Sequence, residues 1–98
     1  MVLKNPKAKG SRLELKAKAE IESTGYYCVK SGGSFGLFDL LCTPYSSKSM
    51  GLAVQVKANR KPSRKEMKAM AEMRLPDDYC KQVWIWHDRK GWEKITVI

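Results

Sequence analysis

The sequence predicts a single α/β domain in which helices flank a central mixed β-sheet, with the elements in the order α-β-β-β-α-β-β. A chain of 98 residues is enough for one domain with a modest core. Two segments of helix-forming residues are separated by short stretches rich in β-branched and aromatic residues. The composition, 43% hydrophobic and 30% charged, is that of a globular chain and not of a disordered one.

The first helix is expected over residues 11–24, after a basic tail at residues 1–10. Apolar residues alternate in this segment as they would in a strand, but its Ala, Leu, Glu and Lys content favours a helix. Ser11 is followed three residues later by Glu14, which is the pattern of a capping box, and Gly25 is a typical stop. Residues 11–98 are therefore expected to form the folded domain.

Turn-forming residues separate the remaining elements. The glycine-rich segment 31–36 predicts a turn, and residues 88–91 (DRKG) predict a hairpin between the last two strands. Ser63, followed by Glu66, predicts a capped start of the second helix. The strands are expected at residues 26–30, 37–43, 51–58, 81–87 and 92–98, and the second helix at residues 64–74.

The charge balance indicates a polyanionic partner. Nineteen Lys and Arg against ten Asp and Glu give a net charge of +9 and an isoelectric point near 9.6. Each phosphate that such a surface neutralises releases counterions and so adds affinity for nucleic acid. A generic basic protein of the ribosomal type is the alternative.

The cysteines and the hydropathy pattern bear on the compartment. Three cysteines without CxxC spacing predict buried thiols in a reducing compartment, and not a zinc site. The sequence contains neither a recognisable signal peptide nor an apolar run long enough to span a membrane. We therefore expect a cytoplasmic location.

One acid and one Q-x-K pair carry the candidate chemistry. Asp39 lies within an apolar stretch, where a bare carboxylate is costly unless it is paired or bound to a metal. Gln55 and Lys57 are two residues apart and so share one strand face, which strand pairing would bring beside Asp39. Oxygen donors suit a hard divalent cation, and an ammonium can orient water and stabilise a charged transition state. The pattern predicts metal-assisted phosphodiester hydrolysis.

At these residues the sequence resembles the PD-(D/E)XK nuclease superfamily, whose motif is an acid on one strand and an acid-x-Lys on the next. The motif stands here as Phe38-Asp39 and Gln55-Val56-Lys57. Residues 9–60 are similar, more narrowly, to archaeal and phage Holliday junction resolvases, through the stretch KGSRLELKAKAEIESTGYYCVKSGGS. The resemblance covers about half of the chain with motifs and implies a restriction-endonuclease-like fold.

The resemblance also implies roles for individual residues. Lys57 would be the catalytic lysine and Asp39 the metal-binding acid, with Glu14 as the helix glutamate and Ser34 as the turn serine that contacts DNA. Asp39, Gln55 and Glu14 would hold Mg²⁺, with Mn²⁺ as an alternative. The family further implies a homodimer that acts on four-way DNA junctions in recombination and repair. Residues expected to bind DNA are Lys9, Arg12, Lys30, Ser34, Arg60, Lys61 and Arg64.

Gln55 departs from the family pattern, which usually has an acid at this position. An amide can coordinate a cation through its oxygen but brings no negative charge. Two alternatives to a resolvase stay open. One is a nuclease of the same fold that acts on flaps, nicks or duplex sites, and the other, which Gln55 would mark, is a DNA-binding module that has lost catalysis. An ordinary surface amide is the alternative interpretation of Gln55 itself.

Overall fold

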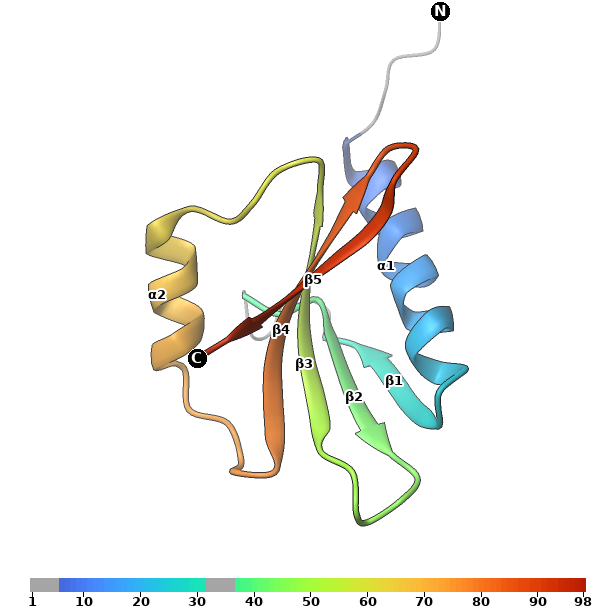
Figure 1. Cartoon of the computed structure of the whole chain (residues 1–98), viewed down its shortest axis with the longest axis vertical. Helices are drawn as coiled ribbons and strands as arrows, with labels where there is room; N and C mark the ends of the chain where they lie inside the picture. The colour runs from blue at the N-terminus through green and yellow to red at the C-terminus, as the bar shows by residue number, and fades with distance from the viewer. Residues whose placement is uncertain (1–5, 32–36) are drawn as a thin grey trace, which may run out of the picture.

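The computed structural model describes residues 6–31 and 37–98 and contains the predicted order of elements. Figure 1 shows the two helices on either side of the strands. Each element lies within a few residues of its expected position, so the predicted α/β architecture is confirmed. The elements are α1 (Pro6–Glu22), β1 (Tyr26–Lys30), β2 (Leu40–Pro44), β3 (Gly51–Ala58), α2 (Arg64–Glu72), β4 (Tyr79–His87) and β5 (Gly91–Val97).

The five strands form one mixed sheet in the order β1-β2-β3-β4-β5. Neighbouring strands are antiparallel except for β3 and β4, which are parallel. Because a parallel pair needs a crossover, the chain leaves the end of β3, passes through α2 and returns to start β4. This connection places Glu66, in the first turn of α2, within 2.9 Å of the Lys57 ammonium near the carboxyl end of β3.

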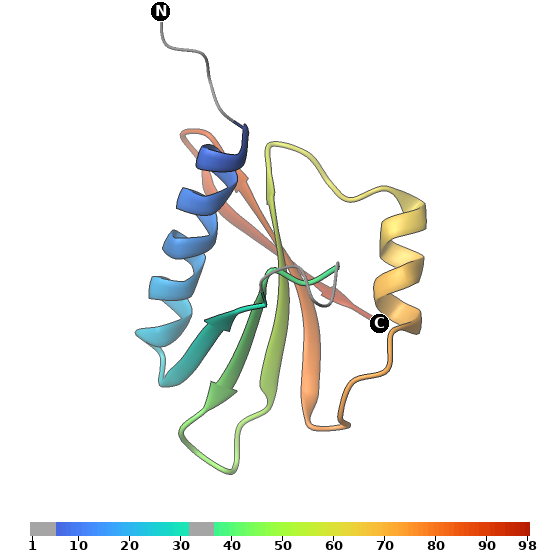
Figure 2. The same ribbon diagram turned by 180° about the vertical axis from the view of Figure 1, so that it is seen from behind.

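Helices α1 and α2 cover opposite faces of the sheet, as the views in Figures 1 and 2 both show. Ala17 and Ile21 of α1 pack with Val54 of β3, whereas Met70 of α2 packs with Ala53. Strand side chains alternate between faces, so the odd-numbered residues of β3 face α2 and the even-numbered ones face α1. This alternation decides which residues of β3 can share a site.

Helix α1 begins at Pro6, five residues before the expected start and inside the segment expected to be a tail. Proline suits a first helical turn, where its missing N–H costs nothing. The predicted capping box of Ser11 and Glu14 is therefore wrong, because Ser11 lies within the helix. Its hydroxyl accepts a hydrogen bond from Lys30 Nζ at 3.2 Å, and the Glu14 carboxylate is not committed to a cap.

The predicted start of α2 is confirmed. Ser63 is the N-cap, its side chain accepts a hydrogen bond from the Glu66 N–H at 3.1 Å, and Glu66 Oε1 accepts one from the Ser63 N–H at 3.1 Å. This reciprocal pair satisfies two of the backbone donors that a helix start leaves open. It also fixes the position of the Glu66 carboxylate relative to β3.

Replacing Ser63 with alanine is expected to lower the free energy of unfolding by about 1 kcal/mol, because the Glu66 N–H loses its acceptor. Urea denaturation of the variant and the wild type measures the difference. A midpoint equal to that of the wild type would show that the cap contributes nothing to stability.

Strand β2 begins at Leu40 and not at residue 37, so Asp39 precedes the strand instead of lying within it. Its backbone still takes part in pairing, since the Asp39 N–H donates to Val54 O at 2.8 Å and the Ser31 N–H donates to Asp39 O at 3.0 Å. Asp39 is thereby held at the point where β2 starts beside β3.

The remaining sequence expectations concern cysteines and membrane spans. All three cysteines are free. Cys28 and Cys42, which are opposite each other in the register of β1 and β2, are buried. Cys80 is only partly buried. In the part of the chain that the structure describes, neither helix is long and apolar enough to cross a bilayer.

Candidate active site

Asp39, Gln55 and Lys57 come together where β2 starts beside β3. The register of β2 and β3 pairs Leu40 with Val54, which puts Asp39 level with Gln55. Gln55 and Lys57 occupy alternate positions of β3 and so lie on the same face as Ala53, which packs under α2. The structure therefore places the three residues close together, as the strand pattern predicted, while their chemical roles stay a proposal.

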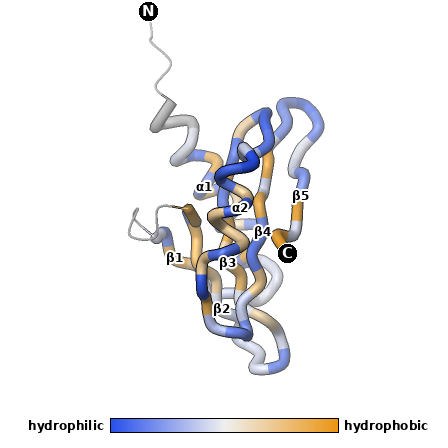
Figure 3. Tube along the Cα trace, turned by 90° about the vertical axis from the view of Figure 1, so that its left-hand side faces the viewer, coloured by the Kyte–Doolittle hydropathy of each residue, from blue (hydrophilic) through white to orange (hydrophobic). Residues whose placement is uncertain are grey.

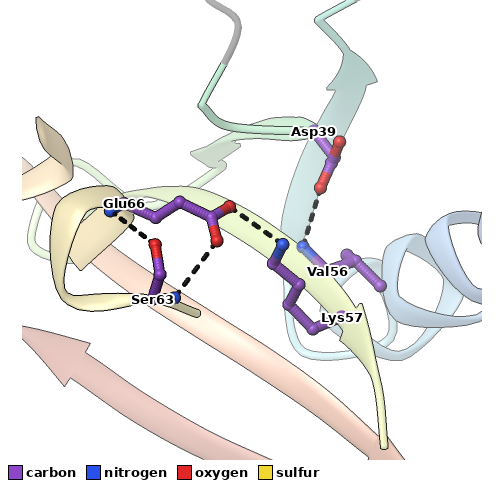
Figure 4. Close-up of polar contacts among 5 residues, drawn as sticks. All are labelled: Asp39, Val56, Lys57, Ser63 and Glu66. Carbon is purple, nitrogen blue, oxygen red and sulfur yellow. Dashed lines mark hydrogen bonds and ion pairs between the residues drawn. The ribbon is translucent and has the colours of Figure 1, made fainter. Parts of the chain in front are cut away.

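Asp39 is a partly buried carboxylate with one clear partner. Its Oδ2 accepts a hydrogen bond from the Val56 N–H at 2.8 Å (Figure 4). Burial raises the pKa of the Asp39 carboxyl above its ordinary value and the charge of Glu14 adds to this, whereas the Val56 N–H and the ammonium groups of Lys57 and Lys30 act in the opposite direction. An acid that is partly desolvated beside another carboxylate gains from a bound cation.

Gln55 is the one polar residue that is buried among those described, with 6% of its surface exposed. The interpretation of Gln55 as an ordinary surface amide is therefore wrong. Its Oε1 has no hydrogen-bond partner within the described part of the chain. A buried acceptor without a partner costs about 1–3 kcal/mol, so this oxygen is placed for a ligand.

The donor atoms fit a magnesium ion. Mg²⁺ takes one or two carboxylates together with other oxygens and keeps several of its waters, and Asp39 and the free Oε1 of Gln55 meet this need. Over residues 6–31 and 37–98, no group of three or more His, Cys, Asp and Glu side chains is gathered for a metal. A cation here would therefore depend on the Gln55 amide and water as well as on carboxylates.

Lys57 is held by a residue that sequence reasoning did not include in the site. Its side chain is 18% exposed, and its Nζ lies 2.9 Å from Oε2 of Glu66 in the first turn of α2 (Figure 4). Hydrogen bonds from Lys57 and from the Ser63 backbone lower the pKa of the Glu66 carboxyl. Glu66 was expected only as a capping residue, and its nearness to Lys57 depends on the path of the chain between β3 and α2.

Glu14 and Lys30 form a second ion pair near Asp39. Lys30 Nζ lies 3.3 Å from Glu14 Oε1, which joins α1 to the end of β1. Both groups influence the pKa of Asp39, so the structure brings them into its electrostatic surroundings. Ser34 lies outside the described residues, as does the side chain of Lys9, and their expected DNA contacts are not described.

Three of the residues expected to bind DNA are exposed just after the end of β3. Arg60 and Lys61 follow β3, Arg64 opens α2, and all three are exposed. Figure 3 shows hydrophilic residues along the turn between β4 and β5. Polar and basic residues thus surround the end of the sheet where β3 stops.

An open hollow of about 310 Å³ lies between α1 and the β4–β5 hairpin. It is lined by Arg12, Leu13, Lys16 and Trp86, and Lys16 Nζ lies 3.8 Å from the centre of the Trp86 ring. Trp86 also packs edge to face against Trp92, at 5.2 Å between ring centres. Arg12 was expected to bind DNA, whereas no role was expected for Lys16.

Neither a protein-family model nor a curated protein matches this sequence. A solved structure does match: Hjc, a Holliday junction resolvase from the archaeal hyperthermophile Archaeoglobus fulgidus, superposes with a TM-score of 0.71 at 20% sequence identity. The match covers 91% of this chain and 73% of that one. At this identity the likeness concerns the fold, and it confirms that this chain has the α/β fold of an archaeal Holliday junction resolvase, as its sequence resemblance implied.

Proposed function

We propose that this chain is a metal-dependent endonuclease that hydrolyses phosphodiester bonds in branched DNA, in the manner of a Holliday junction resolvase. The observation that carries the proposal is the buried Oε1 of Gln55, which has no partner among the described residues and lies on the same face as Lys57 and level with Asp39. The fold shared with a resolvase adds support. The net charge of +9 suits a DNA substrate.

The residues of the site divide the chemistry between them. Asp39 and Gln55 would hold Mg²⁺ or Mn²⁺, with Glu14 adding negative charge from α1. The cation, when bound, lowers the pKa of a water ligand and neutralises charge on the phosphate. The Lys57 ammonium would orient the attacking water and stabilise the added negative charge of the transition state.

The DNA backbone would lie across the exposed basic residues at this end of the molecule. Arg60, Lys61 and Arg64 are exposed near the site, and Arg12 and Lys16 line the hollow beside Trp86. Such contacts add affinity without sequence preference. The proposal keeps Lys9, Lys30 and Ser34 as further DNA contacts. It also includes a homodimer, since resolving a junction requires a cut in each of two strands.

A panel of labelled DNAs tests the substrate. The wild-type protein is incubated with Mg²⁺ and a four-way junction, a flap, a nicked duplex or a linear duplex. Paired, symmetric cuts in the junction alone are expected. Equal cutting of the flap or the linear duplex would retain a nuclease but contradict the proposed junction preference.

One observation favours a second candidate function, a DNA-binding module without catalysis. Gln55 brings no charge, and the described residues hold no three-acid group. Such a module would bind junction DNA equally in Mg²⁺ and in a chelator. It would leave the DNA intact after long incubation at high protein concentration.

A further inference from the structure

The three strand residues of the proposed site are short of negative charge, and Glu14, which would add charge from α1, is already paired with Lys30. Asp39 contributes one negative charge, Lys57 one positive charge and Gln55 none. A divalent cation beside an ammonium is repelled, and a single partly buried carboxylate offsets this poorly. The nuclease family that the sequence resembles usually has an acid at the position of Gln55, so the question is which residue supplies that charge here.

A further carboxylate, that of Glu66 on α2, lies in contact with Lys57. Its Oε2 is 2.9 Å from Nζ of Lys57, whose side chain shares the α2-facing side of β3 with Gln55. Its Oε1 accepts a hydrogen bond from the Ser63 N–H of the capping box, so both carboxylate oxygens have a partner (Figure 4). A carboxylate has about four acceptor positions, and these two contacts leave the others for a cation or its water.

The Gln55 amide is the independent sign that a ligand belongs on this face. It is 94% buried, and its Oε1 has no partner among the residues that the structure describes. An acid at this buried position would place a second carboxylate level with Asp39 in a desolvated setting. The Glu66 side chain is 36% exposed at the margin of the site, so it brings a negative charge without the cost of burying a carboxylate.

We propose that Glu66 is the second anionic group of the divalent-cation site and supplies, from α2, the charge that Gln55 lacks. In this arrangement Gln55 contributes a neutral oxygen, and Asp39 and Glu66 each contribute one negative charge in addition to the Lys30-paired Glu14. Glu66 acts either directly or through a water ligand of the cation. Lys57 is shared between Glu66 and the reacting phosphate. The inference deepens the proposed function and rests on it.

Calorimetric titration of the metal-free protein with Mg²⁺ and with Mn²⁺ tests the role of Glu66 without relying on catalysis. The Glu66→Gln variant is expected to bind both ions at least about tenfold more weakly than the wild type. Glutamine still fits a capping box, so α2 keeps its start. The matched control, Ser63→Ala, weakens the cap but keeps the carboxylate, and its affinity is expected to stay within about twofold of the wild type.

Charge exchange makes the test specific. Adding Gln55→Glu to the Glu66→Gln variant is expected to restore cation affinity, because the charge returns to the site from β3. If Glu66 acted only by positioning Lys57, the outcome would differ. In a Lys57→Met background, Glu66→Gln would then leave the affinity for the cation unchanged. The proposal expects the tenfold loss to persist in that background.

Two outcomes would overturn the inference. In the first, Asp39→Asn abolishes cation binding but Glu66→Gln leaves the cation affinity unchanged. In the second, the wild-type protein binds neither Mg²⁺ nor Mn²⁺. The proposed function fails separately. Cation binding that depends on Glu66, without cleavage of any DNA, would uphold the inference and reject the nuclease. Cleavage that is unaffected by Glu66→Gln would uphold the nuclease and reject the inference.

Discussion

Replacing Lys57 with methionine is expected to lower the single-turnover rate of Mg²⁺-dependent cleavage of a four-way junction by about 10³-fold. Methionine keeps much of the aliphatic stem of a side chain that is only 18% exposed, but it removes the ammonium next to Glu66. The transition state then lacks the positive group that stabilises its added charge. A quenched time course with labelled junction DNA measures the rate.

The matched control is Lys68→Met, which removes the same charge from α2 at a side chain that is 77% exposed. It is expected to cut within about threefold of the wild type, because an exposed charge of this kind contributes little. Junction binding in a chelator should be nearly equal for the two variants and the wild type. If Lys57→Met cleaved the junction at the rate of the Lys68→Met control, Lys57 would have no role in the mechanism.

Replacing Asp39 with asparagine is expected to abolish both cleavage and the stabilisation of the protein by Mg²⁺. A ligand at a hundred times its dissociation constant stabilises the native state by about 2.7 kcal/mol, which appears as a rise in the melting temperature of the wild type. Without the carboxylate the rise should vanish. Asparagine can still accept the Val56 N–H through its oxygen, so the local structure is expected to persist.

In a chelator, the same variant is expected to melt at a higher temperature than the wild type at neutral pH. Burial raises the pKa of the Asp39 carboxyl, so the folded protein holds the ionised form less favourably than the unfolded chain does. The wild type therefore gains stability as the pH falls through the pKa of the folded state, and the advantage of Asp39→Asn shrinks. Thermal scans from neutral to acidic pH measure this. A variant less stable than the wild type at neutral pH in a chelator would contradict this account of the site.

The order of elements was predictable because local signals agreed with one another. The DRKG sequence marked the turn between the last two strands, and the Ser63–Glu66 pattern gave the start of α2. The predicted glycine-rich turn falls mostly outside the described residues. The start of α1 was missed because residues 6–10 have no apolar periodicity and because Ser11 and Glu14 imitate a cap. Local propensity favoured a later start than the folded chain adopts.

The site was predictable only where strand geometry determines it. The two-residue spacing of Gln55 and Lys57 fixes a common face, and the pairing of β2 with β3 brings Asp39 level with Gln55. Glu66 was not predictable, since its contact with Lys57 arises from the crossover between β3 and α2. The burial of Gln55 was also not predictable, because it depends on α2 covering the face of β3 on which Gln55 lies.

The most direct measurement of the central claim is incubation of the wild-type protein with a labelled four-way junction in Mg²⁺ and, in parallel, in EDTA. The expected result is paired, symmetric cutting in Mg²⁺ and intact DNA in EDTA, with binding in both. Binding without any cutting in Mg²⁺ or Mn²⁺ would contradict the nuclease and leave a DNA-binding module on a resolvase fold.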